Sequence, residues 1–410
     1  MMGIVSIGLL LLIAAAVAMN NTSTTAPLIL AVLPFGCPVT ILGAWLALRP
    51  IDAMLKRRII KHATALRLSH PKLTVIGVTG SVGKTTTKEL LAHILRPLGA
   101  IATPAHLNAE IGVARWMISL LEKLSPDEHR ILIVEMGAYR TGEVALLSEI
   151  TRPQIGIVTY IGSQHLSLFG SKEAIRQTKG ELLRALPNNG HAFLNKDNDA
   201  FDELRNMCSC PVTSVGTDLH ADLAALDVEE TDDGIRFRSA ETLFEVPVSG
   251  THLVTSILLG IAVAKYLGLS TKDIAKEMRN FRPLKHTFEL KAMRGIAVLD
   301  DTYNASPTSF RSAIEWAREQ KSKRKILLAD GIIELGEAEA PIHHSLAKLA
   351  KDVFDAVYII NPHFLPYFSQ VLGDRASLSS LAIRASEGDL LVCVGRMPKS
   401  TIERLLPLET

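Results

Sequence analysis

The hydrophobic and polar positions divide the chain into three parts with different patterns. In the first part, two apolar runs without a charged residue, 3–19 and 27–48, are separated by the polar residues 20–25. Each run is near the length that a helix needs to cross the hydrocarbon core of a membrane. We therefore expect residues 1–49 to form two transmembrane helices joined by a tight turn.

Basic residues crowd after the second apolar run, namely Arg49, Lys56, Arg57, Arg58, Lys61 and Arg67. Because basic residues gather on the cytoplasmic side of membrane segments, we expect the rest of the chain to face the cytoplasm, at a membrane of the bacterial inner-membrane type. A cleaved signal peptide is an alternative for the first run. A buried hydrophobic hairpin in a soluble protein is an alternative for both.

Residues 50–72 are expected to form a basic juxtamembrane linker helix. Apolar residues such as Ile51, Met54 and Leu55 alternate there with lysines and arginines. Such a helix lies on anionic lipid or is a solvated linker, and the sequence leaves both alternatives open.

In the second part, residues 73–286, short apolar strand runs alternate with segments of helix length. The runs are 73–78, 131–134, 155–159 and 192–194. This alternation is typical of a doubly wound α/β sheet. Residues 223–248 break the rhythm around Asp232-Asp233-Gly234, which indicates an antiparallel hairpin extension, and residues 251–267 predict a helix again.

The third part, residues 287–410, repeats the alternation on a smaller scale. Its apolar runs are 296–299, 326–328, 356–359 and 390–394, with helices predicted around 313–316 and Leu346. We expect a separate, smaller Rossmann-like domain.

Composition adds few constraints. The net charge of +2 over 410 residues gives no indication of a nucleic-acid partner. The four cysteines, Cys37, Cys208, Cys210 and Cys393, have neither a disulfide framework nor a metal-binding spacing.

The glycine-rich segment Thr79-Gly80-Ser81-Val82-Gly83-Lys84-Thr85-Thr86 lies between the first predicted strand and a predicted helix. In this context backbone N–H groups and the helix N-terminus face phosphate oxygens, Lys84 reaches the outer phosphates and Thr85 ligates Mg²⁺. The usual pattern has a glycine where this chain has Val78, so the segment is a variant phosphate loop. It predicts binding of ATP or GTP.

Polar residues stand where the predicted strands end, which is where open α/β sheets place their ligands. Glu135 ends one strand and His165 follows another, so each is a candidate for the Mg²⁺ or phosphate site. Alone, each is more often a capping or core polar group. Lys179, taken by itself, is an ordinary lysine of a helix surface.

Several ordered blocks resemble the Mur ligase family, and within it the branch that adds D-alanyl-D-alanine. The blocks are residues 79–89, 107–113, 134–138 with 142–143, 161–166 with 169–171, 179–181, 300–307 and 334–337. The resemblance implies a central ATP-binding domain and a carboxyl-terminal domain that closes over the nucleotide. It also implies an activity: a substrate carboxylate takes the γ-phosphoryl group of ATP, and an amine then converts the acyl phosphate to an amide.

The same resemblance implies roles for individual residues. Thr85 and Glu135 would bind a first Mg²⁺ and His165 a second, while Lys179 would be the lysine that can be carbamylated. Asn108 would lie by the phosphates or the substrate. Three residues would approach from the second domain, namely Asp301, Tyr303 and Asn304.

The chain also departs from the family pattern. The amino-terminal domain that holds the uridine diphosphate end of the substrate is replaced by the apolar hairpin. Thr287 stands where an arginine near the phosphates is usual, and Leu253-Val254-Thr255-Ser256 stands where asparagines approach the adenine. Near the carboxyl end, Val394-Gly395-Arg396-Met397 shortens a Lys-Gly-Ser-Arg pattern.

The leading hypothesis is a membrane-anchored, ATP-dependent ligase of cell-wall precursor synthesis. Its expected partners are ATP, Mg²⁺, a carboxylate-bearing wall precursor, an amino acid or dipeptide amine donor, and membrane lipid, without nucleic acid. The alternative is a degenerate family member that binds ATP and serves as a membrane scaffold for a wall-synthesis protein partner. A membrane-associated GTPase is the third hypothesis, because Asn195-Lys196-Asp197-Asn198 approximates a guanine-binding motif.

Overall fold

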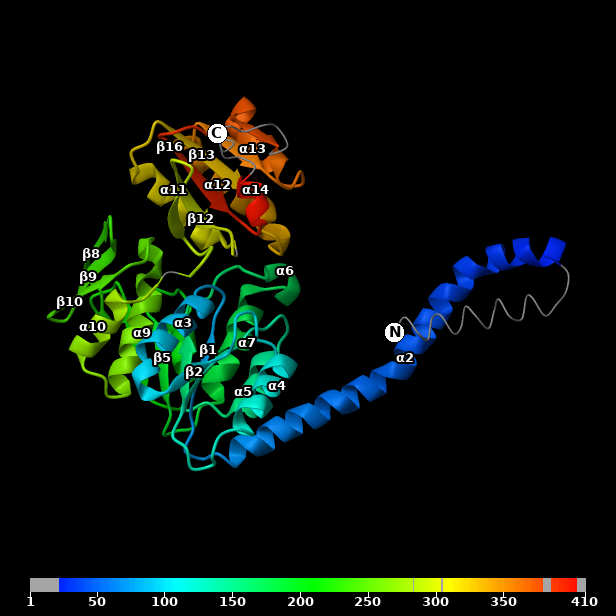
Figure 1. The fold of residues 1–410 in the computed structure, drawn as a ribbon, viewed down its shortest axis with the longest axis horizontal. Coiled ribbons are helices and arrows are strands. Elements are labelled where there is room, and N and C mark those ends of the chain that lie inside the picture. The colour runs from blue at the N-terminus through cyan, green and yellow to red at the C-terminus, as the bar shows by residue number, and fades with distance from the viewer. Residues whose placement is uncertain (1–21, 283, 304, 379–384, 404–410) are drawn as a thin grey trace. The chain divides into compact units, whose positions relative to one another are not determined.

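The computed structural model describes residues 22–282, 284–303, 305–378 and 385–403. The chain divides into two units, residues 1–65 and 66–410. The second unit contains the β-sheets, and it carries the residues expected to act on a nucleotide (Figure 1).

A parallel sheet forms the central part, in the order β2-β3-β1-β4-β5-β6-β7. Its strands are β1 (Thr74–Thr79), β2 (Ala100–Ala102), β3 (Ile131–Glu135), β4 (Ile155–Val158), β5 (His191–Asn195), β6 (Val212–Gly216) and β7 (Leu223–Ala224). Strands β1 and β3 are buried along almost their whole length. Their continuous apolar runs therefore suit strands that are covered on both faces.

Helices cover both faces of this sheet (Figure 1). They are α3 (Lys84–Ile94), α4 (Glu110–Leu121), α5 (Glu143–Thr151), α6 (Leu166–Phe169), α7 (Lys172–Arg184), α8 (Phe201–Asn206), α9 (Val254–Tyr266) and α10 (Thr271–Arg279), with short 3₁₀ turns η1 (Arg96–Leu98) and η2 (Thr251–Leu253). On one face α3, α9 and α10 pack together over Ile76 and Val78 of β1. On the other face α5 packs against α4 and α7.

Gly77 shows how closely the second layer approaches. A Cβ atom at this position would lie 2.8 Å from a methyl group of Leu182 in α7 and 2.9 Å from the methyl group of Met136. Since real side chains do not approach so closely, a strand glycine is what allows α7 to lie against β1.

The topology places a crevice at the end of β1. The chain runs from β1 through α3 to the edge strand β2, returns to β3 beside β1, and then continues to β4 on the opposite side of β1. The carboxyl ends of β1, β3 and β4 thus meet at a point where the strand order reverses. This is the position at which open α/β sheets bind ligands.

The predicted antiparallel extension is confirmed. Strands β8 (Leu226–Thr231), β9 (Gly234–Ser239) and β10 (Thr242–Val246) form a separate antiparallel sheet. Asp232 and Asp233 connect β8 to β9, and Gly234 follows with φ +134°. A glycine accommodates that backbone angle without strain.

A third sheet follows in the order β11-β12-β16-β13-β14-β15. Its elements are β11 (Glu289–Met293), β12 (Ile296–Asp301), α11 (Pro307–Glu319), β13 (Arg324–Ala329), η3 (Gly336–Ala338), α12 (Glu339–Lys351), β14 (Ala356–Ile359), α13 (Leu365–Leu372), η4 (Gly373–Arg375), β15 (Ala376–Leu378), β16 (Asp389–Val394) and α14 (Lys399–Glu403). Among the described strand pairings within this sheet, β11 with β12 is antiparallel and the others are parallel. The expected α/β class, with a parallel sheet and a carboxyl-terminal α/β part, is confirmed.

The structure of the amino-terminal part differs from the prediction. Residues 22–25, expected in a tight turn, lie in helix α2 (Thr22–Leu68), which continues without a break through the Arg49-Pro50 step. Proline has no backbone N–H, so one hydrogen bond of the helix is missing at Pro50. The residues that follow are good helix formers, and the helix continues. The first apolar run, 3–19, lies outside the described residues. Among the helices of the described part of the chain, none has the length and apolar character needed to cross a membrane.

Arg67, near the end of α2, is 4% exposed, and its guanidinium donates hydrogen bonds to backbone carbonyls. Its guanidinium donates to the carbonyl oxygens of Thr151 at 2.9 Å, His70 at 3.0 Å and Leu73 at 3.2 Å. Burial, followed by the charge of Arg152, lowers the pKa of Arg67. The residue therefore joins the start of β1 to the end of α5.

Replacement of Arg67 by alanine should lower the free energy of unfolding of the second unit by roughly 2–4 kcal/mol, because several buried carbonyls lose a charged donor. Urea unfolding followed by circular dichroism measures this change. Arg58→Ala, at an exposed position of the same helix, is the matched control and should have little effect. Equal stability of the two variants would contradict the proposed role of Arg67.

Candidate active site

The phosphate loop connects β1 to α3 and is held by the end of β4. The backbone N–H of Ser81 donates to the carbonyl of Tyr160 at 2.6 Å, and the Thr159 hydroxyl donates to the carbonyl of Val82 at 2.6 Å. A Cβ atom at Gly80, where φ is +144°, would lie 2.1 Å from the Thr159 hydroxyl oxygen. The loop can therefore adopt this close contact only with glycine at position 80.

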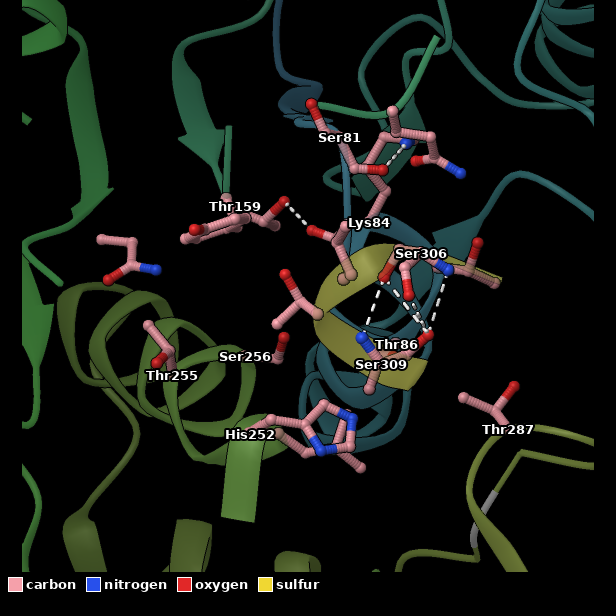
Figure 2. A pocket seen from close by; sticks show the side chains of 18 of the residues that line it. Ser81, Lys84, Thr86, Thr159, His252, Thr255, Ser256, Thr287, Ser306 and Ser309 are labelled. Carbon is pink, nitrogen blue, oxygen red and sulfur yellow. Dashed lines mark hydrogen bonds between the residues drawn. The ribbon is translucent and has the colours of Figure 1, made fainter. Parts of the chain in front are cut away.

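Lys84 is the first residue of α3, and its ammonium group closes the loop on itself. It donates to the carbonyl oxygens of Gly80 at 2.8 Å and Ser81 at 3.0 Å. Burial lowers the pKa of Lys84, and the Glu135 carboxylate partly opposes that shift. The ammonium is thus held within the turn that is expected to bind phosphate (Figure 2).

Glu135, at the end of β3, is 4% exposed and lies beside the helix that follows the loop. The Thr85 hydroxyl lies 3.2 Å from both of its carboxylate oxygens, and the Asn108 amide donates to one of them at 3.3 Å. The backbone N–H of Glu135 donates to the Thr103 hydroxyl at 3.1 Å. Three residues of the predicted site, Thr85, Asn108 and Glu135, are therefore in direct contact.

Lys88 belongs to the same cluster, and the sequence prediction did not single it out. Its side chain is fully buried, donates to the carbonyl of Thr103 at 2.9 Å, and lies 3.6 Å from Glu135 Oε2 and 2.9 Å from Glu89 Oε1. A buried cation next to Glu135 offsets the cost of burying that carboxylate. Its position one helical turn after Lys84 was the available signal.

Lys179 is also buried, with 2% exposure, on the inner side of α7. Its ammonium lies 3.5 Å from the carbonyl of Ala138, just after β3, and 5.7 Å from the ring centre of Phe169. Burial, followed by the positive charge of Lys84, lowers the pKa of Lys179 to about 7. The prediction of an ordinary surface lysine, made from Lys179 alone, is wrong because α7 turns this face toward β3.

His165 directly precedes α6, at its N-cap, in a left-handed backbone conformation with φ +63°. Its ring packs against Tyr139 at a centroid distance of 5.0 Å, and its Nδ1 hydrogen-bonds Glu334 of the second domain. Burial lowers the pKa of His165, Glu334 opposes this, and the charges of Lys84 and Lys179 lower it further. Lys84, His165 and Lys179 are therefore close enough to act on one another electrostatically.

A cavity of about 280 Å³ extends from the phosphate loop to the second domain (Figure 2). Figure 2 shows the residues around it: Ser81, Lys84 and Thr86 of the loop and α3, Thr159 after β4, His252 of η2, Thr255 and Ser256 at the start of α9, and Thr287, Ser306 and Ser309 of the second domain. Burial lowers the pKa of His252 to about 4, and its Nδ1 has no partner among the described residues. The cavity thus has a charged, glycine-rich end at the phosphate loop, and hydroxyl and imidazole groups line it near the start of α9.

The second domain contributes two of the three residues expected from it. Asp301 lines the cavity, accepts from the backbone N–H of Phe288 at 3.2 Å, and leaves Oδ2 buried without a partner in the described part of the chain. Burial raises the pKa of Asp301 to about 7. Tyr303 also lines the cavity and stacks on His106, with ring centroids 5.3 Å apart. Asn304 lies outside the described residues.

The donor set around Glu135 fits a magnesium ion. The Thr85 hydroxyl and the Glu135 carboxylate are hard oxygen donors that already converge to 3.2 Å. Lys179 offers an amine, which does not suit Mg²⁺ unless it is converted to a carbamate. Elsewhere, His286, Glu289 and Asp300 lie close enough to hold a cation, but the Lys291 ammonium already pairs with both carboxylates.

Comparison with known proteins relates both α/β parts of the chain to one family. Residues 78–264 match the Mur ligase middle domain, and residues 288–397 match the Mur ligase glutamate ligase domain. UDP-N-acetylmuramoyl-tripeptide--D-alanyl-D-alanine ligase of Bacillus subtilis is 31% identical over 78% of this chain and 72% of its own length. The enzyme of the same name from Mycobacterium bovis is 35% identical over 70% of this chain, which spans 58% of that relative.

Solved structures give the same result. MurF from Acinetobacter baumannii superposes with a TM-score of 0.77 at 25% identity, over 85% of this chain and 80% of that one. MurF ligase from Thermotoga maritima, solved in complex with ADP, superposes with a TM-score of 0.71 at 27% identity, over 85% and 82%. The chain therefore belongs to the Mur ligase family, whose members are ATP-dependent ligases that form amide bonds.

Proposed function

We propose that this chain uses Mg²⁺ and ATP to join a carboxylate-bearing precursor of peptidoglycan to an amine. The observation that carries the proposal is the contact of Thr85, Asn108 and Glu135 beside the phosphate loop, with Lys84 and Lys179 nearby. Sites for phosphoryl transfer need this combination of oxygen donors for a metal ion and cations for the transferred group.

The names of the relatives suggest the substrate class. The Bacillus and Mycobacterium proteins are named for UDP-N-acetylmuramoyl-tripeptide and D-alanyl-D-alanine. We propose a muramoyl-peptide type of carboxylate and an amino acid or dipeptide amine for this chain. The apolar amino-terminal runs further suggest a lipid-linked or membrane-proximal form of the precursor.

The first chemical step would form an acyl phosphate. An oxygen of the substrate carboxylate attacks the γ-phosphorus of ATP, and the bond between that phosphorus and the bridging oxygen breaks to release ADP. The N–H groups of the loop and the ammonium of Lys84 would stabilise the negative charge on the transferred group. Thr85 and Glu135 would hold the first Mg²⁺ and His165 the second, and these ions would supply further charge neutralisation when bound.

The second step would form the amide. The neutral amine attacks the acyl carbon, inorganic phosphate leaves with the former carboxylate oxygen, and the amine loses one proton to solvent or to a neighbouring base. Asp301 and Tyr303, which line the nucleotide cavity, would bring the second domain onto the bound nucleotide.

A second candidate function is an ATP-binding scaffold for a wall-synthesis protein. Thr287 lines the cavity where the family pattern has an arginine near the phosphates, and Thr255 and Ser256 line it where asparagines are usual. These replacements weaken the expected contacts to the nucleotide but leave the Glu135 cluster intact.

The direct test is ADP release by the full-length protein with Mg²⁺-ATP. It should rise when a muramoyl-peptide carboxylate and an amine such as D-alanyl-D-alanine are both present. Lys84→Ala should reduce the stimulated rate by about 100-fold or more, because a charge that stabilises the transferred group is lost. The control Lys123→Ala changes an exposed lysine and should retain the rate. Tight ATP binding without stimulation by any pair of UDP-linked or lipid-linked precursor and amine would favour the scaffold.

We also propose that Lys179 is carbamylated, which would turn its buried amine into an oxygen ligand for the second metal ion. Carbamylation consumes a neutral amine and CO₂ and releases a proton. With its pKa near 7, about half of Lys179 is neutral at pH 7, whereas almost none of an ordinary lysine is.

Ligase activity should therefore depend on CO₂ and weaken as the pH falls below 7, because the lowered pKa leaves the amine neutral only above that value. Rates measured from pH 6 to 8 in CO₂-depleted and bicarbonate-containing buffers test this dependence. Lys179→Ala should lose activity on the order of 100-fold and regain part of it with added short carboxylates. The control Lys172→Ala alters an exposed lysine of the same helix. Activity of wild type and Lys179→Ala that is equal, and insensitive to CO₂, would contradict carbamylation.

Finally, we propose that residues 1–49 attach the chain to the cytoplasmic face of a bacterial inner membrane. Two features of the sequence support this proposal: the uncharged apolar runs 3–19 and 27–48, and the basic residues that follow the second run.

Membrane fractionation of the full-length chain and of a chain starting at residue 50 tests the attachment. The full-length chain should stay in the membrane pellet after alkaline carbonate washing, and the shortened chain should appear in the supernatant, since only the former keeps the apolar runs. Release of the full-length chain by carbonate would contradict the proposal.

A further inference from the structure

The loop after β4 and the segment after β13 are joined by two hydrogen bonds of different kinds. The carboxylate of Glu334 hydrogen-bonds Nδ1 of His165, and the backbone N–H of Ser167 donates to the carbonyl of Glu334 at 3.1 Å. Gly336 lies against the same turn, since a Cβ atom there would meet Ser167 at 3.4 Å. Backbone and side chain thus fix Glu334 against His165 across two domains.

Both partners of this contact adopt a backbone conformation that costs energy. His165 has φ +63° and Glu334 has φ +66°, in the left-handed region that non-glycine residues rarely occupy. Such conformations persist where the surrounding structure determines them, and they gather at functional sites. Their pairing in one contact indicates that the position of the two side chains is itself required.

The contact determines which ring nitrogen of His165 carries the proton. An ionised carboxylate only accepts hydrogen bonds, so Nδ1 must donate. In a neutral imidazole the other nitrogen, Nε2, then has a free lone pair. Histidine in water prefers the opposite tautomer, with the proton on Nε2.

We propose that Glu334 is a positioning residue that holds His165 as the Nδ1–H tautomer and so prepares Nε2 to bind the second Mg²⁺. The inference rests on the proposed function, in which His165 is a metal ligand. A carboxylate that orients a metal-binding histidine is a common device in metal sites. Here the carboxylate comes from the other domain, 169 residues along the chain, so the histidine is oriented only when the two domains meet.

The first test reads the tautomer without nucleotide, metal or turnover. Full-length protein labelled with ¹⁵N in its histidines is studied at pH 8 in the presence of EDTA, and the His165 signals are assigned by their loss in His165→Gln. Wild type should carry the proton on Nδ1. Glu334→Ala should shift the proton to Nε2, and Glu334→Gln should keep it on Nδ1, because the glutamine carbonyl oxygen still accepts. Glu337→Ala, at an exposed position of η3, is the matched control and should resemble wild type.

The second test measures Mg²⁺ affinity in the presence of a non-hydrolysable ATP analogue by titration calorimetry. Glu334→Ala should weaken Mg²⁺ binding about tenfold or more, and Glu334→Gln should restore most of it. Both tests proceed even if no ligase substrate is found, so failure of the proposed function would not be mistaken for failure of this inference.

Two results would overturn the proposal. The first is an Nε2–H tautomer in wild type, or a tautomer that Glu334→Ala leaves unchanged. The second is a raised KM for the amine donor in Glu334→Gln with unchanged Mg²⁺ affinity, which would mean that Glu334 binds the incoming ammonium group instead.

Discussion

The site depends on one constraint: the carboxylate of Glu135 must be buried beside the phosphate loop with its oxygens paired. An unpaired buried carboxylate is costly, so each neighbour has to be supplied by the fold. Thr85 and Lys88 come from α3, Asn108 from the segment before α4, and Thr103 from the end of β2. The order of the strands around β1 brings these segments to one edge, and the same edge carries the phosphate loop.

The sequence predicts the inner strands well, because their burial on both faces requires long apolar runs. Strands β1, β3, β4, β12 and β16 coincide closely with predicted runs. Strands β2, β11 and β15 lie at sheet edges and were not predicted, because they carry no long apolar run. Strand β6, inside its sheet, was not predicted because its sequence mixes valine with threonine, serine and glycine. The predicted helix after the phosphate loop begins at Lys84, since Gly83, with φ +87°, already completes the turn.

The residues of the candidate site also fall into two groups: those that a local sequence pattern predicts, and those whose position depends on packing or on distant segments. The phosphate-loop motif and the strand-end position of Glu135 are local features, so they could be predicted together with their contact. Burial of Lys88 and Lys179 depends on how helices pack on the sheet, and the pairing of His165 with Glu334 joins distant segments. Apart from the spacing of Lys88 one helical turn after Lys84, none of these features leaves a local pattern in the sequence. At the amino terminus, the polar residues 22–25 suggested a turn, but they lie within helix α2.

The central claim is that the two domains carry a substrate carboxylate through an acyl phosphate on its way to an amide. The most direct measurement follows ¹⁸O from a labelled substrate carboxylate during turnover with ATP and the amine. The account predicts that one labelled oxygen appears in each inorganic phosphate released, because the carboxylate oxygen that attacks the γ-phosphorus leaves with it. Phosphate without label, formed in step with the amide product, would contradict the account.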